Sequence, residues 1–142
     1  MNRADPQVRS IARQLLAFES PEAGANPPAE FRTTDKLRPH LSMLMGGEGF
    51  QALLARELVL AAVEAPWLAA VQAVVGGELE GLAGAHAKLG AAEFSEGEAA
   101  LLAQLLGLLV AFIGPALTLR LTNQIWPRLS FDDADLGGTA NQ

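Results

Sequence analysis

Residues 99–119, AALLAQLLGLLVAFIGPALTL, carry no charge and constrain the fold more than any other part of the chain. Gln104 is the only strongly polar side chain among them. The segment reaches the length of about 20 residues that a helix needs to cross a bilayer. However, Gly114 and Pro115 interrupt it after an apolar helix of the kind that lies at the centre of globular domains. The segment must therefore be buried, either in a protein core or in lipid.

One side of this segment carries small residues. On a helical wheel, at about 100° per residue, a narrow strip contains four small residues and one amide: Ala100, Ala103, Gln104, Gly107 and Ala111. Small residues at this spacing let a second backbone approach closely. A glycine inside a helix is roughly 1 kcal/mol less favourable than alanine, so a close contact should offset that cost. We therefore expect Gly107 to lie at a tight helix contact.

Local signals mark both ends of the helix. The sequence SEGE at 95–98 has the Ser-x-x-Glu spacing of a capping box, in which the hydroxyl and the carboxylate each accept from a free backbone N–H. Gly114 suits the left-handed position that ends a helix, and Pro115 suits the first turn of the next helix. The sequence therefore predicts a helix over about 96–113, a corner, and a second helix over 115–126.

Residues 48–64 form the second largely apolar segment, and a helix that is apolar nearly all round is a buried one. Glu57 and Glu64 lie on one side of this helix, two turns apart. Paired carboxylates can bind a metal ion or share a proton. No histidine accompanies them at ligand spacing, so we expect the pair to mark the one solvated edge of the helix.

Shorter segments flank these two helices. The Asp-Pro pair at 5–6 opens an amphipathic helix, and Thr-Thr-Asp at 33–35 is predicted to cap the next one. The pattern loosens between residues 72 and 94. The glycine pair at 76–77 could turn a small hairpin there, but the alternation is too short, and we expect an irregular loop.

The predicted fold class is all-α, a compact bundle of about five to six helices around two central helices at about 48–64 and 96–113. The predicted organisation is an N-terminal amphipathic helix with a Pro-rich connector at 1–33, a helical core domain at 34–127 and a flexible acidic tail at 128–142. A chain of 142 residues is large enough for one such core.

Composition restricts the partners of the chain. Half of the residues are apolar and only 18% are charged, so apolar surface should remain for a partner. The formal net charge is −6 and the Lys and Arg residues are scattered, which argues against a nucleic-acid partner. The chain has no cysteine, and its N-terminal segment lacks the apolar core of a signal peptide. We therefore expect a cytoplasmic protein.

Motifs for chemistry are missing from the sequence. His40 and His86 are the two histidines, and neither has the spacing of a metal site. No serine stands in a Gly-x-Ser-x-Gly elbow, and the glycine pairs lack the lysine of a phosphate-binding loop. We therefore predict a non-enzymatic protein with no catalytic, cofactor-binding or metal-ligating residues.

Three patterns carry a resemblance: LRPHLxxLMGxxGFxxLLxRxLxLA at 37–61, PWLxxV at 66–71, and EGEAALLAQLLGLLVAFIGxxLTLRLxxxIWP at 96–127. Together they resemble a family of uncharacterised bacterial proteins, and the likeness covers most of the chain after residue 35. The family has no assigned activity. The resemblance therefore implies a bacterial, one-domain protein and no particular function.

Three functions remain open. The first is a soluble interaction or regulatory domain that buries apolar surface in a homodimer or against a protein partner. The second is a membrane-active protein whose segment 99–119 inserts into a bilayer, and the third is a binder of a small apolar ligand between helices. Tryptophan and arginine most often carry binding energy, and Gly107 allows close approach. The predicted interface residues are Arg56, Trp67, Gly107, Arg120 and Trp126.

Overall fold

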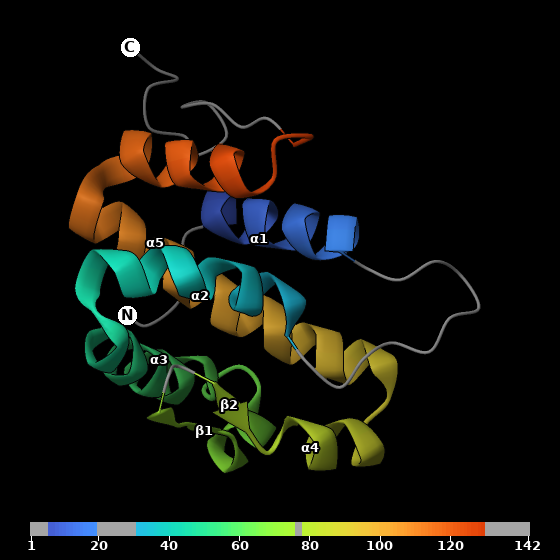
Figure 1. The fold of residues 1–142 in the computed structure, drawn as a ribbon. Helices are drawn as coiled ribbons and strands as arrows, with labels where there is room; N and C mark the ends of the chain where they lie inside the picture. Colours follow the sequence, from blue (N-terminus) through green and yellow to red (C-terminus); the bar gives the residue numbers. More distant parts are fainter. Residues whose placement is uncertain (1–5, 20–30, 76–77, 130–142) are drawn as a thin grey trace.

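The computed structural model describes residues 6–19, 31–75 and 78–129, and within them the fold is all-α, as predicted (Figure 1). In chain order the elements are α1 (Pro6–Glu19), α2 (Arg32–Met45), α3 (Gly47–Ala61), the 3₁₀ helix η1 (Pro66–Ala70), β1 (Gln72–Ala73), β2 (Leu79–Glu80), α4 (Leu82–Lys88) and α5 (Ala91–Ile125).

The bundle is built on α5. The helices α1, α2 and α3 all pack against it, and α2 and α3 also pack against each other. Large side chains from five elements fill the core and are fully buried: Leu15, Phe31, Leu37, Leu41, Phe50, Leu54, Leu68, Leu101, Leu102, Leu105, Leu106 and Trp126. The predicted division at residue 33 remains a prediction, although α1 shares this core. Most of the predicted connector and acidic tail lies outside the described residues.

The predicted corner in α5 is confirmed. Gly114 has φ +90° and ψ 160°, a conformation that costs glycine little and other residues much more. Pro115 follows it in the first turn of the second half, where a missing N–H costs nothing. The Thr118 hydroxyl donates a hydrogen bond of 2.8 Å to the Gly114 carbonyl. The second half of α5 therefore folds back and covers α1 on the side away from the first half (Figure 1).

The predicted start of this helix was wrong. The helix begins at Ala91, so the segment 95–98 lies inside it. Glu98 instead faces α2, where one carboxylate oxygen accepts hydrogen bonds from the Thr33 N–H at 3.3 Å and the Thr33 hydroxyl at 2.7 Å. The N-cap residue of α2, Phe31, offers no polar side chain. Glu98 therefore supplies from α5 the acceptor that the N-terminus of α2 lacks, and the residues predicted to cap α2 lie within it.

The predicted irregular loop between residues 72 and 94 was also wrong, because it contains a small hairpin and the helix α4. The strands β1 and β2 pair antiparallel. The Val74 N–H extends the pairing with a hydrogen bond of 2.8 Å to the Glu78 carbonyl. Gln51 of α3 donates a hydrogen bond of 3.4 Å to the Ala73 carbonyl. Strands this short depend on such contacts with the core.

Candidate functional site

Large apolar side chains are exposed on both sides of the Gly114 corner. Phe112 is 75% exposed and Leu117 is 49% exposed. Ala111, Pro115 and Ala116 are exposed as well. We call residues 111–117 the apolar corner. Because the segment that contains it carries no charge, the apolar corner presents continuous uncharged surface to solvent.

The C-terminal end of α2 adds two more exposed apolar side chains. Met43 is 88% exposed and Leu44 is 61% exposed. Gly46 ends α2 with φ +82°, and α3 begins directly after it. In Figure 1 this turn and the corner of α5 both lie on the left side of the molecule. The C-terminal end of α2 and the corner of α5 therefore lie toward the same side of the molecule in this view.

Two of the predicted interface residues lie within two turns of the apolar corner. Gly107 is half-buried on the first half of α5, and Arg120 is exposed on the second half. In the small-residue strip, the members before Gly107 are buried, whereas Ala111 after it is exposed. The strip therefore begins in the core and ends at the apolar corner.

The structure does not bring the other three predicted interface residues to the same place. Arg56 is exposed on α3. Trp67 is half-buried and stacks on Phe94 of α5, with ring centroids 5.6 Å apart and planes 16° apart. Trp126 is 1% exposed. Both tryptophans therefore pack within the bundle itself, which leaves little of either side chain for a partner.

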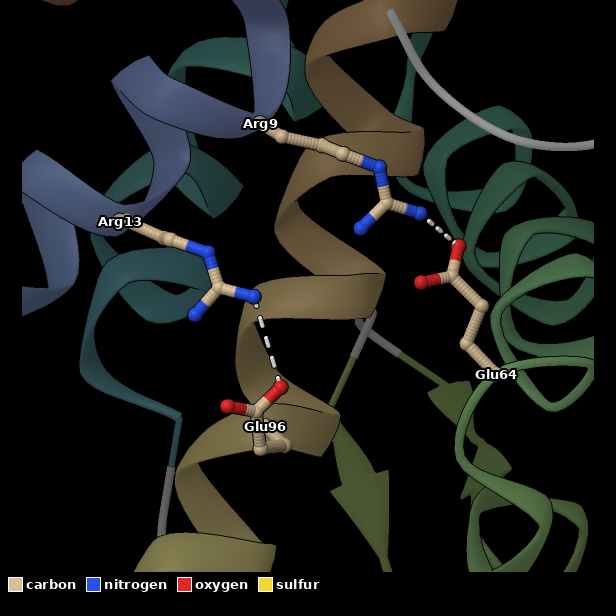
Figure 2. A network of polar contacts seen from close by, with 4 residues as sticks. All are labelled: Arg9, Arg13, Glu64 and Glu96. Atoms are coloured by element: carbon tan, nitrogen blue, oxygen red, sulfur yellow. Dashed lines mark hydrogen bonds and ion pairs between the residues drawn. The ribbon is translucent and has the colours of Figure 1, made fainter. Parts of the chain in front are cut away.

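A network of four charged side chains holds α1 against the bundle (Figure 2). Arg9 pairs with Glu64, which follows α3, and the Arg13 Nη2 atom lies 3.5 Å from a carboxylate oxygen of Glu96 on α5. The hydrogen bond to Glu64 raises the pKa of the Arg9 guanidinium above its usual value. The four residues and two alanines of α5 enclose a polar cavity of about 70 Å³. Sequence periodicity gave no sign of this network, because its members come from three separate segments.

The predicted solvated edge of α3 was wrong. Glu57 is 1% exposed, because it lies on the same face as Phe50, Leu54 and Ala61, which point into the core. Its Oε2 atom has no hydrogen-bond partner among the residues that the structure describes. Burial raises the pKa of the Glu57 carboxyl above its usual value, and the nearby charge of Arg56 opposes this shift. Glu64 is also largely shielded, with 18% of its side chain exposed.

A shallow apolar groove of about 410 Å³ lies between α3, η1 and β1. In the ligand-binding alternative, the small-residue strip and Gln104 would line a pocket between helices, but Gln104 is buried in the bundle. The residues that give the groove its apolar character are Leu58, Val59, Ala62, Leu68, Ala69 and Val71.

Within the described residues, no group of three or more His, Cys, Asp or Glu side chains could hold a metal ion. Comparison of the chain with protein-family models, curated proteins and solved structures finds no match. The family resemblance carried by the sequence patterns therefore remains a prediction.

Proposed function

We propose that the chain is a non-enzymatic interaction domain that buries its apolar corner against a second copy of itself. The observation that carries this proposal is the exposure of Phe112 and Leu117 on both sides of Gly114, with no charge between residues 99 and 119. Exposed apolar patches of this kind mark interaction sites in soluble proteins. A cytoplasmic location is part of the same proposal.

The charge of the chain favours a contact through this surface. Two copies with a net charge of −6 each repel one another, so they can associate only where apolar burial outweighs that repulsion. In a two-fold symmetric dimer the same patch meets itself, and an uncharged patch does so without like-charge contact. Arg120 lies exposed one to two turns after the corner, where it could face acidic side chains of the second copy at the rim.

Specific observations support the two alternatives less strongly. By length and composition α5 could cross a membrane, but part of its apolar segment is buried inside the bundle and the backbone at Gly114 is not helical. The groove beside α3 falls within the size range of small-molecule sites, which supports an apolar-ligand binder. Its lining supplies few polar groups to orient a ligand.

Light scattering behind a sizing column, without detergent, tests the proposal. We expect the purified protein to show twice its chain mass of 14.9 kDa. Phe112→Asp should weaken association at least about tenfold, because a buried, unpaired carboxylate costs more than the 1.4 kcal/mol that a tenfold change represents. The matched control is Val75→Asp, since Val75 is 84% exposed on the hairpin and does not belong to the apolar corner.

A monomeric wild-type protein, or a dimer that persists in Phe112→Asp, would overturn the self-association proposal. The same samples separate the alternatives. Co-sedimentation with liposomes that depends on Phe112 would favour the membrane reading, and an apolar compound extracted from the purified protein and detected by mass spectrometry would favour the ligand reading.

A further inference from the structure

Glu57 occupies an unusual place for a carboxyl group. It lies near the centre of the core-facing side of α3, and that helix packs against α2, α5, η1 and β1. Only 1% of the residue is exposed, and within the described part of the chain its Oε2 atom has no hydrogen-bond partner. A buried carboxylate without hydrogen bonds is strongly disfavoured, whereas the neutral acid is tolerated. Burial in the folded bundle therefore favours the protonated form of this group over the carboxylate.

Few charges act on this carboxyl. The elements η1 and β1 carry no charged side chain. On α2, Arg38 lies 3.3 Å from Asp35, and on α5, Glu98 accepts its hydrogen bonds from the N-terminus of α2. Among the residues that the structure describes, Glu57 makes one ion-pair contact, with its neighbour Arg56, whose Nε atom lies 3.9 Å from Oε2. That distance is too long for a hydrogen bond, and the charge of Arg56 lowers the pKa of the carboxyl by less than burial raises it.

We propose that Glu57 is a proton-binding group that makes the packing of α3 against the rest of the bundle dependent on pH. The protonated side chain remains in the core. When the carboxyl loses its proton to solvent, the resulting carboxylate is stabilised by contact with water and by a hydrogen-bonded ion pair. Arg56 is 69% exposed on the adjacent side of α3, so outward movement of this helix would provide both.

The direction of the effect follows from burial, which raises the folded-state pKa of Glu57 above its unfolded value. The unfolded value is near 4.3, as for an ordinary glutamate. The stabilising contribution of the neutral carboxyl is therefore fully present below that pH and is lost as the pH rises through the folded-state pKa. Glu57 should make the bundle less stable toward neutral pH, the opposite of an ion-paired glutamate.

Thermal unfolding followed by circular dichroism, from about pH 4 to pH 8, tests the proposal. We expect the difference in Tm between Glu57→Gln and the wild-type protein to grow as the pH rises, because glutamine keeps the neutral shape and cannot ionise. Glu48→Gln is the control, since Glu48 is exposed in the first turn of the same helix and should leave the pH profile as in the wild type. Parallel profiles for the wild type and Glu57→Gln would overturn the proposal.

A second measurement needs no variant and therefore does not depend on whether Glu57→Gln folds. Carbon-13 NMR of the Glu57 side-chain carboxyl in the wild-type protein should show a titration midpoint above the ordinary value for a glutamate. Amide hydrogen exchange in α3, corrected for the intrinsic effect of pH, should accelerate over the same range. An ordinary midpoint for Glu57, or exchange in α3 that does not follow its titration, would contradict the proposed coupling.

Discussion

At the residue scale, Gly97 is the glycine whose lack of a side chain has the clearest structural reason. A β-carbon built on it would lie 2.1 Å from the Cζ2 atom of Trp67, so the indole ring rests directly against the backbone of α5. The ring also stacks on Phe94 and meets Phe31 edge-on, with centroids 6.2 Å apart. Neighbours on two sides leave the indole little room to move.

Gly97→Ala should therefore destabilise the protein by about 1–3 kcal/mol, the usual cost of overpacking, even though alanine favours helices. Urea unfolding measures this free energy. Gly84→Ala in α4 is the control, because nothing lies within 4 Å of its added β-carbon, and there we expect no loss or a gain of up to about 1 kcal/mol. Equal effects at the two sites would show that Trp67 can move aside.

The sequence patterns predicted where the helices lie, but they did not predict what surrounds single residues within them. The segment 48–64 is apolar on nearly every side, so periodicity could not decide which of its polar residues faces the core, and Glu57 was assigned to the wrong side. Gly97 was read as part of a helix start, and nothing local indicates that Trp67 covers it. Both features depend on residues that are distant in sequence.

At the element scale, two ion pairs of different burial fix α1 to the bundle. In the pair of Arg9 with Glu64, the side chains are 24% and 18% exposed, whereas in the pair of Arg13 with Glu96 they are 56% and 64% exposed. Arg9→Ala should destabilise the protein by about 1–3 kcal/mol, because it removes the charged hydrogen bond that this arginine makes to a shielded carboxylate. Arg13→Ala should cost less than about 1 kcal/mol, as solvent-exposed ion pairs do.

Urea unfolding of the two arginine variants measures the two losses in unfolding free energy. The positions are well matched, because the arginines lie one turn apart on the same helix. A double-mutant cycle with Glu64→Ala and Glu96→Ala then separates each pair from other contacts of the same side chains. A cost for Arg13→Ala as large as that for Arg9→Ala would mean that burial does not set the strength of these pairs.

Helix ends show where local rules succeed and fail at this scale. The corner at Gly114 was predicted correctly, because the left-handed glycine and the following proline act through their own backbones. The capping box at 95–98 was not, because Glu98 serves the N-terminus of α2 instead. A capping signal in the sequence shows that a hydrogen-bond acceptor is present, but it does not show which helix N-terminus donates to that acceptor.

At the scale of the whole molecule, half of the residues are apolar, which correctly indicated both a large core and leftover apolar surface. Composition could not locate that surface. The segment 99–119 contains both kinds of residue, since its first half fills the core and its end forms the apolar corner. The folding back of α5 at Gly114 places exposed apolar side chains on both sides of this glycine at the surface.

The charge of the whole chain determines how salt should affect the proposed dimer. Each copy carries a net charge of −6, while the apolar corner carries none. Raising the salt concentration from about 0.05 M to 0.5 M shortens the screening length to well below 10 Å, which weakens the repulsion between copies and leaves apolar burial intact. We therefore expect the dimer to tighten several-fold, as measured by sedimentation equilibrium. Phe112→Asp should stay monomeric at both salt concentrations if the gain reflects the apolar corner and not general salting-out. A dimer that loosens with salt would instead be held by ion pairs, and the contact would then have to lie on a charged face of the bundle.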